Sequence, residues 1–325
     1  MSLRARRRPN PTSRGRSPGA PSAAVAGAVM ATIVVIWGLG PPVTKLITAP
    51  ALVAVSVRFW CSMPVVWAIV LLTGRRVPRE VLRRTALPGA LFGINLVLVF
   101  AALQHASVAV LAVISSMQPG VVLLVAGPWL GERATRWHLA WTAAGVVGVV
   151  VVVLGGHDDV QGDALGYLFG IGSMLTFTAY SLINRRVRSG TSMDPLQWMA
   201  GITLFASLTV TPVALALSSP GDYGELGGAD WLYLAFVAGV VGVVSHTMMS
   251  WVHAFIPASR SSLFLLGAKV VAISAAWPLH DEPVTLVQVL GALIVIGAVS
   301  AVMSRPTSVR LVAPPAPLAT VPARP

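Results

Sequence analysis

The sequence predicts an all-α integral membrane protein built from ten transmembrane helices. Only 10% of its 325 residues are charged while 55% are hydrophobic, and the mean hydropathy is +0.78. Such a composition supplies too few polar side chains to cover a water-exposed surface. Apolar runs of about 20 residues, enough to cross a hydrocarbon core ~30 Å thick, recur along the chain.

Ten apolar runs are expected to form the spans. The first five cover residues 24–47, 51–72, 87–103, 106–130 and 139–155. The second five cover residues 165–184, 198–217, 231–252, 261–279 and 287–303. We therefore expect one five-helix repeat over residues 22–156 and another over 164–303. Residues 1–21 and 304–325 cannot bury a core, so the first is predicted to be a disordered basic cytosolic tail and the second a disordered cytosolic tail.

The basic residues predict the orientation. With the N-terminus inside, 20 of the 23 Lys and Arg residues fall in cytoplasmic tails and loops. The other three, Lys45, Arg58 and Lys269, lie within predicted spans. We expect a multi-pass protein of the inner (plasma) membrane with both termini in the cytoplasm. Because the basic residues lie in short loops and tails and not on a folded basic domain, nucleic-acid binding is excluded.

A weak internal repeat accompanies the helix plan. A shift of 150 residues lays 89–132 on 239–282 and matches Pro128 with Pro278 and Glu132 with Glu282. Only five of the 44 aligned positions are identical, so the helix plan and the shared Pro-x-x-x-Glu ending carry the comparison. Five is an odd number of spans, so the second half is expected to lie inverted relative to the first.

Five segments resemble the EamA-type transporters of the drug/metabolite transporter superfamily. They are "IWGLGPPVTKLI" from Ile36, "VRFW" from Val57, "SSMQPGVVLLVAGPWLGERAT" from Ser115, "WVHAFIPASRSSLFLL" from Trp251 and "WPLHDEPVTLVQVLGALIVIGAV" from Trp277. The resemblance covers residues 24–303 and implies two inverted five-helix repeats that transport a small solute. One departure stands out, because Lys269 replaces the proline that the second repeat of this family usually carries in alignment with Pro119.

Lys269 is the leading candidate for a substrate contact. A charge near the middle of a membrane span is costly, so it is expected to face a cavity or a partner. It would pair with a carboxylate or phosphate; the alternative is a lysine that reaches the interface or bonds a backbone carbonyl. Arg58 is a second candidate, for which a structural role is equally open. Gln118 and Pro119 are expected to contribute a polar side chain beside a broken helical hydrogen bond.

Four further polar or aromatic side chains within spans are candidates for the binding site, although bonding between helices is the ordinary role of such groups. They are Trp37, Asn95, Tyr180 and His246. Three charged residues near helix ends are expected to have structural or gating roles: Lys45, Glu132 and Glu282.

These features predict a secondary transporter, an exporter or exchanger of a polar, anionic or zwitterionic solute such as an amino acid. No Asp or Glu lies within a predicted span, so the usual carboxylate for proton or sodium coupling is missing. The sequence has neither a GxxxxGK loop nor a His, Cys or carboxylate cluster with metal spacing, so we expect neither ATP-driven pumping nor any cofactor or metal. Multidrug efflux is the alternative; an integral membrane enzyme and a non-transporting scaffold are remote ones. The expected partners are a small-molecule substrate and the lipid bilayer, and a homodimer remains open.

Overall fold

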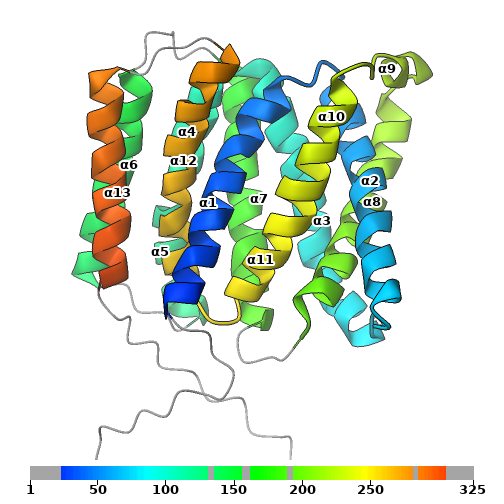
Figure 1. Cartoon of the computed structure of the whole chain (residues 1–325), viewed down its shortest axis with the longest axis horizontal. Helices are drawn as coiled ribbons and strands as arrows, with labels where there is room; N and C mark the ends of the chain where they lie inside the picture. The colour runs from blue at the N-terminus through cyan, green and yellow to red at the C-terminus, as the bar shows by residue number, and fades with distance from the viewer. Residues whose placement is uncertain (1–22, 131–134, 156–161, 189–192, 281–284, 305–325) are drawn as a thin grey trace, which may run out of the picture.

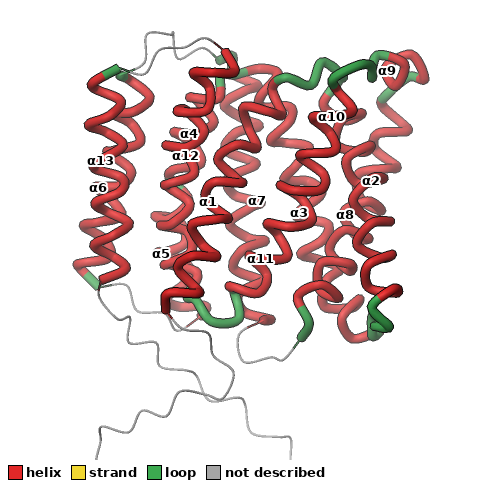
Figure 2. The backbone as a smooth tube through the Cα atoms, viewed as in Figure 1, coloured by secondary structure: helices red, strands yellow, loops and turns green. Residues whose placement is uncertain are grey.

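The structure is a bundle of long helices, as Figures 1 and 2 show. The computed structural model describes residues 23–130, 135–155, 162–188, 193–280 and 285–304. Within these residues the only β contact is an isolated bridge between Ala106 and Gly162. The tails predicted at 1–21 and 304–325 lie almost wholly outside the described residues, which end at Ser304.

The described residues of the first half form six helices. They are α1 (Ala23–Lys45), α2 (Ala51–Leu72), α3 (Arg79–His105), α4 (Val108–Ser116), α5 (Gln118–Leu130) and α6 (Arg136–Leu154). The span predicted over 106–130 is therefore broken at Met117, because Pro119 has no N–H to donate and its ring crowds the preceding turn. Helix α3 begins at Arg79 and not near residue 87, since its polar first two turns continue the helix beyond the apolar run.

The second half repeats this plan with one addition and one distortion. Its elements are α7 (Ala164–Arg188), α8 (Pro195–Leu217), α9 (Pro220–Gly224), α10 (Asp230–Ala235), η1 (Phe236–Val244), α11 (Ser245–Val252), α12 (Ala258–His280) and α13 (Leu286–Ser304). The short helix α9 lies between α8 and α10. The middle of the span formed by α10, η1 and α11 is a π-helix nine residues long. Such wide turns are rare and occur mostly at functional sites.

The described residues provide ten membrane-length segments when α4 with α5 and α10 with η1 and α11 are each counted once. Seven of the described helices are long and apolar enough to cross a membrane by length and composition alone. Large apolar side chains cover the outside of the bundle, where Leu72 is 87% exposed, Leu124 77% and Leu217 73%. A water-soluble monomer rarely exposes so much apolar surface, so the chain is a multi-pass membrane protein.

Corresponding helices of the two halves make corresponding contacts with the other half. Helix α1 lies along α12, and its counterpart α7 packs in the same way against α4 and α5. Helix α3 packs between α7 and α8, and α6 pairs with α13 at one edge of the bundle (Figure 1). Because α1 is the first membrane-length segment and α7 the sixth, the two helices run in opposite directions, and the halves are inverted relative to each other.

Small residues set the close packing of α6 on α13. A Cβ atom at Gly148 would lie 3.0 Å from the Gly291 carbonyl oxygen, and one at Gly291 would lie 2.8 Å from the Gly148 carbonyl oxygen. Gly145 also packs closely, with a Cβ there 2.6 Å from Leu266 Cδ1. At Gly297, by contrast, no described atom lies within 4 Å of a Cβ built at that position.

The bundle has a basic end and an opposite end. The basic end is the one at which α1 begins and α13 ends, and Figure 1 shows both at the same face. The turn from α2 to α3 and the end of α7, which carry most of the described arginines, also lie there. The opposite end carries α9 and the first residues of α7 and α10. Which end faces the cytoplasm stays a prediction.

Candidate functional site

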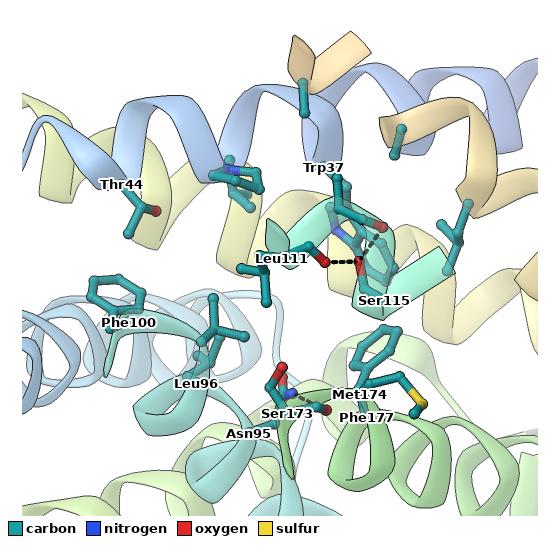
Figure 3. Close-up of a pocket in the computed structure, with 18 of the residues that line it drawn as sticks. Trp37, Thr44, Asn95, Leu96, Phe100, Leu111, Ser115, Ser173, Met174 and Phe177 are labelled. Atoms are coloured by element: carbon teal, nitrogen blue, oxygen red, sulfur yellow. Dashed lines mark hydrogen bonds between the residues drawn. The ribbon is translucent and has the colours of Figure 1, made fainter. Parts of the chain in front are cut away.

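A central cavity of about 170 Å³ lies between the two halves. Helices α1 to α5 line it from the first half, and α7, η1, α11 and α12 from the second. Figure 3 shows side chains such as Leu96, Leu111 and Phe177 pointing toward its centre from different helices. The cavity extends from Trp37 at mid-depth toward Thr44 near the end of α1, so it approaches the opposite end of the bundle.

Six of the eight side chains predicted to bind substrate line this cavity: Trp37, Arg58, Asn95, Gln118, His246 and Lys269. Tyr180 instead lines a much smaller pocket on the basic side of Trp37. Pro119 is buried and is not among the lining residues of any described pocket; its effect is on the backbone, through the break between α4 and α5.

Lys269 is held at the cavity wall by the contact of α12 with α1. Gly38 permits that contact, because a Cβ at this position would lie 2.8 Å from the Ala268 carbonyl oxygen. Among the described residues Lys269 Nζ makes neither a hydrogen bond nor an ion pair, and the side chain faces the cavity. The alternative of a lysine bonded to a backbone carbonyl therefore has no support within the described chain.

Arg58 enters the cavity from α2, beside the π-helix. Its side chain is 4% exposed, and a Cβ at Gly242 would lie 3.5 Å from its Nη2 atom. The absence of a side chain at Gly242 leaves room for the guanidinium against η1. Among the described residues this guanidinium also makes no hydrogen bond or ion pair.

Neutral polar groups complete the lining. Asn95 donates its side-chain N–H to the Ser173 carbonyl at 2.8 Å, and Ser115 donates its hydroxyl to the Leu111 carbonyl at 2.6 Å (Figure 3). Gln118 Nε2 and His246 Nδ1 are buried, and neither has a hydrogen-bond partner within the described part of the chain. None of the lining residues is Asp or Glu, so the cavity contains unpaired donors and two cations without an acidic side chain.

An aromatic cluster, which we call the floor, closes the cavity toward the basic end. The Trp37 indole donates its N–H to Ser245 Oγ, and its ring lies 4.7 Å from the His246 ring and 5.6 Å from the Phe177 ring between centroids. Tyr180 stacks on Phe92 at 5.2 Å and lies 5.8 Å from Phe177. The pocket beneath the floor has a volume of only about 10 Å³, so little open space continues from the cavity toward the basic end.

Two buried arginines tie α7 to α11 below the floor. Arg185 Nη1 donates to the His253 carbonyl at 2.8 Å, and Arg188 donates Nε to the Ser250 carbonyl at 2.7 Å and Nη2 to the Met193 carbonyl at 3.0 Å. The topology predicted from the sequence assigns both arginines to a cytoplasmic loop. The structure corrects this prediction, because α7 continues to Arg188 and both side chains are buried. A basic run directly after an apolar span gives no signal of burial.

The residues predicted to be structural or gating separate into two cases. Lys45 is exposed at the end of α1 and borders a small pocket beside Phe100 and Gln104, outside the main cavity lining. Glu132 and Glu282 lie outside the described residues.

Two carboxylates that the sequence places in outer loops make specific contacts. Asp230 is buried and accepts hydrogen bonds from Thr48 N at 3.1 Å and Thr48 Oγ1 at 2.8 Å, which fixes the end of α1 to α10. Asp163 accepts from the Gly166 N–H at 2.8 Å and contacts His105 Nδ1 at 2.9 Å. These contacts, the Gly166 N–H first, lower the pKa of Asp163. The pair joins α3 of the first half to α7 of the second.

Inverted halves around a central cavity are typical of a membrane transporter. The model of the EamA-like transporter family matches residues 25–154 and 164–304. The chain belongs to the EamA-like transporter family.

Known proteins similar to this chain agree with that assignment. An "Uncharacterized transporter" of Archaeoglobus fulgidus is 27% identical over 288 residues, which are 85% of this chain and 98% of the relative. A "Probable amino-acid metabolite efflux pump" of Escherichia coli is 26% identical over 285 residues, 83% of this chain and 91% of the relative. A solved crystal structure matches with a TM-score of 0.68 at 20% identity, covering 86% of this chain and 97% of that one, and supports the fold.

Proposed function

We propose that this transporter exports or exchanges a small polar solute bearing a carboxylate or phosphate group, such as an amino acid. Lys269 carries the proposal, because it faces a cavity whose lining has no acidic side chain to neutralise it. A cation in a low-dielectric cavity is stabilised by an anionic ligand, which the solute would supply. The name of the Escherichia coli relative, a probable amino-acid metabolite efflux pump, supports the same class of solute.

The solute would cross by alternating access between the inverted halves. With the basic end in the cytoplasm, as the distribution of Lys and Arg favours, the described conformation has its cavity directed outward. The floor and the arginine contacts close the cytoplasmic side. The reverse state would require these contacts to open while the opposite end closes. The site of action in this proposal is the inner (plasma) membrane, with both termini in the cytoplasm.

Efflux of lipophilic drugs is the second candidate function. The apolar lining, with Phe92, Phe100 and Phe177, favours it. Two cationic side chains in the same cavity disfavour cationic drugs, because like charges repel in a medium of low dielectric constant.

Flux in proteoliposomes tests the proposal. Labelled neutral amino acids, acidic amino acids, organic acids and a cationic dye would be offered to native protein and to Lys269→Gln. We expect carboxylate flux that falls at least tenfold in Lys269→Gln. Arg79→Gln, which removes an exposed cation at the start of α3, is the control and should retain most of the flux. Equal flux in native protein and Lys269→Gln, or flux of the dye alone, would refute the proposal.

A further inference from the structure

Two cations, and not one, line the cavity without a compensating acid. Lys269 belongs to α12, which packs against α1 and α13, whereas Arg58 belongs to α2, which packs against α3, α8 and η1. Figure 1 shows α12 and α2 on different sides of the bundle. The two charges therefore enter the same cavity from different walls.

Neither charge is neutralised within the described part of the chain. No hydrogen bond or ion pair there involves Arg58 or Lys269, and every residue that lines the cavity is described and none is acidic. Asp230, the buried carboxylate of the described chain, is bonded to Thr48 instead. Two like charges in a membrane-embedded cavity are each costly and repel each other, so the empty site favours anionic ligands in general.

The neutral groups of the lining increase this preference. Gln118 Nε2 is an unpartnered donor within the described residues, and its side chain is 5% exposed. One of the two amide N–H groups of Asn95 is given to the Ser173 carbonyl, and the Asn95 side-chain oxygen is one of the acceptors of the lining. An ammonium group of a zwitterion would therefore find hydroxyl and amide oxygens but no carboxylate, while anionic groups would find donors on several walls.

Resting on the function proposed above, we propose that the preferred substrate carries two separate anionic groups, one held by Lys269 and the other by Arg58. A small organic dicarboxylate satisfies this arrangement. Its short carbon chain would lie between the two walls against Leu96 and Leu111, which also line the cavity. A monocarboxylate or a neutral amino acid would leave one of the two cations unpaired, and burying an unpaired charge is strongly unfavourable.

A matched set of four-carbon solutes tests the inference. Succinate carries two carboxylates and butyrate carries one. Aspartate and asparagine give the same comparison of two carboxylates with one, and each also carries an ammonium group. In proteoliposomes with native protein we expect succinate flux to exceed butyrate flux at least tenfold, and aspartate to exceed asparagine. Arg58→Gln should lower succinate flux at least tenfold and reduce the preference over butyrate to less than threefold. Arg58→Lys keeps the charge and should restore part of the preference.

Two controls separate the outcomes. Arg79→Gln, an exposed arginine at the start of α3, should leave the succinate preference unchanged. Thermal stabilisation of native protein in detergent by succinate, compared with butyrate at equal ionic strength, reports the preference without any variant. Suppose that native protein transports asparagine or butyrate at the same rate as succinate, and that Arg58→Gln lowers these fluxes alike. This result would overturn the two-anion inference and leave the proposed function intact. Native protein that moves none of the four solutes nor a phosphorylated organic acid would overturn the proposed function itself.

Discussion

Arg188 at the end of α7 donates its Nε–H to the Ser250 carbonyl of α11 at 2.7 Å, from a side chain that is 2% exposed. The same guanidinium reaches the Met193 carbonyl before α8. One buried cation thus joins three segments of the second half beneath the cavity floor. The Ser250 carbonyl lies in the last turn of α11, where the helix itself supplies no donor.

Replacing Arg188 with Gln should destabilise this side of the protein. Two hydrogen bonds from a charged group are lost, one buried and one partly buried, so we expect the free energy of unfolding to fall by about 3 kcal/mol. Thermal unfolding in detergent measures the effect. Arg76→Gln, an exposed arginine at the same end, is the control. Equal midpoints for Arg188→Gln and Arg76→Gln would contradict the role given to this contact.

Gly38 should tolerate no side chain. A Cβ there would lie 2.6 Å from Val271 Cγ1 and 2.8 Å from the Ala268 carbonyl oxygen, so Gly38→Ala must displace α12 and with it Lys269. Overpacking of this kind costs about 1–3 kcal/mol, and we expect solute flux to fall as well. Gly297→Ala adds the same methyl group to α13 where no atom lies within 4 Å and should be neutral in both measurements. A Gly38→Ala protein with native stability and flux would disprove the close packing of α1 on α12.

Trp37 should be required for closure of the floor. Trp37→Ala removes the contacts with Phe177, His246 and Ser245 and joins the cavity to the pocket beneath it, where Ser181 lies. In a Cys61→Ser background, we expect a cysteine introduced by Ser181→Cys to react at least fivefold faster with an impermeant thiol reagent when Trp37→Ala is present. Trp37→Phe keeps an aromatic ring and should give a smaller increase. Unchanged reactivity in Trp37→Ala would show that Trp37 does not seal the cavity.

The Asp163 carboxylate should contribute to stability in a defined pH range. Its pKa is lowered by the Gly166 N–H and by His105, so it binds fewer protons in the folded protein than in the unfolded chain. The stabilisation is therefore present above the unfolded pKa of about 3.9 and is lost as the pH falls through the lower folded value. We expect Asp163→Asn to unfold at a lower temperature than native protein near pH 7, with the difference shrinking below about pH 4. A difference independent of pH would exclude the charge of Asp163 as its source; Glu225→Gln is the control.

The sequence predicts the fold in more detail than the site. Composition and apolar runs identify α2 to the residue, because the run from Ala51 to Leu72 has a proline before it and a polar turn after it. Pro119 indicates the break in the fourth span, but the π-helix at Phe236–Val244 escapes prediction, since apolarity is the same for a straight and a distorted span. An inverted plan follows from the odd number of spans and needs no sequence identity between the halves.

For the site, charge is the informative signal. Lys269 and Arg58 are recognisable because a cation within a span needs a cavity or a partner, and both line the cavity. Phe92, Ser115 and Phe177 are absent from the sequence-based prediction, because aromatic and hydroxyl side chains are common throughout the spans. Which of them converge depends on contacts between helices far apart in the chain, such as α3 with α7. The substrate-binding role of these residues stays a prediction.

Labelling of the cavity during transport tests the central claim most directly, namely that solute passes through the space between the two halves. In a Cys61→Ser background, Ser115→Cys places a thiol in the cavity lining, and Leu124→Cys places one on the 77% exposed outer surface of α5. The account predicts that an impermeant thiol reagent added from the outside modifies the cysteine at 115 and lowers solute flux at least tenfold, whereas the variant at 124 keeps its flux. If the cysteine at 115 is modified and flux continues unchanged, the solute does not pass through this cavity.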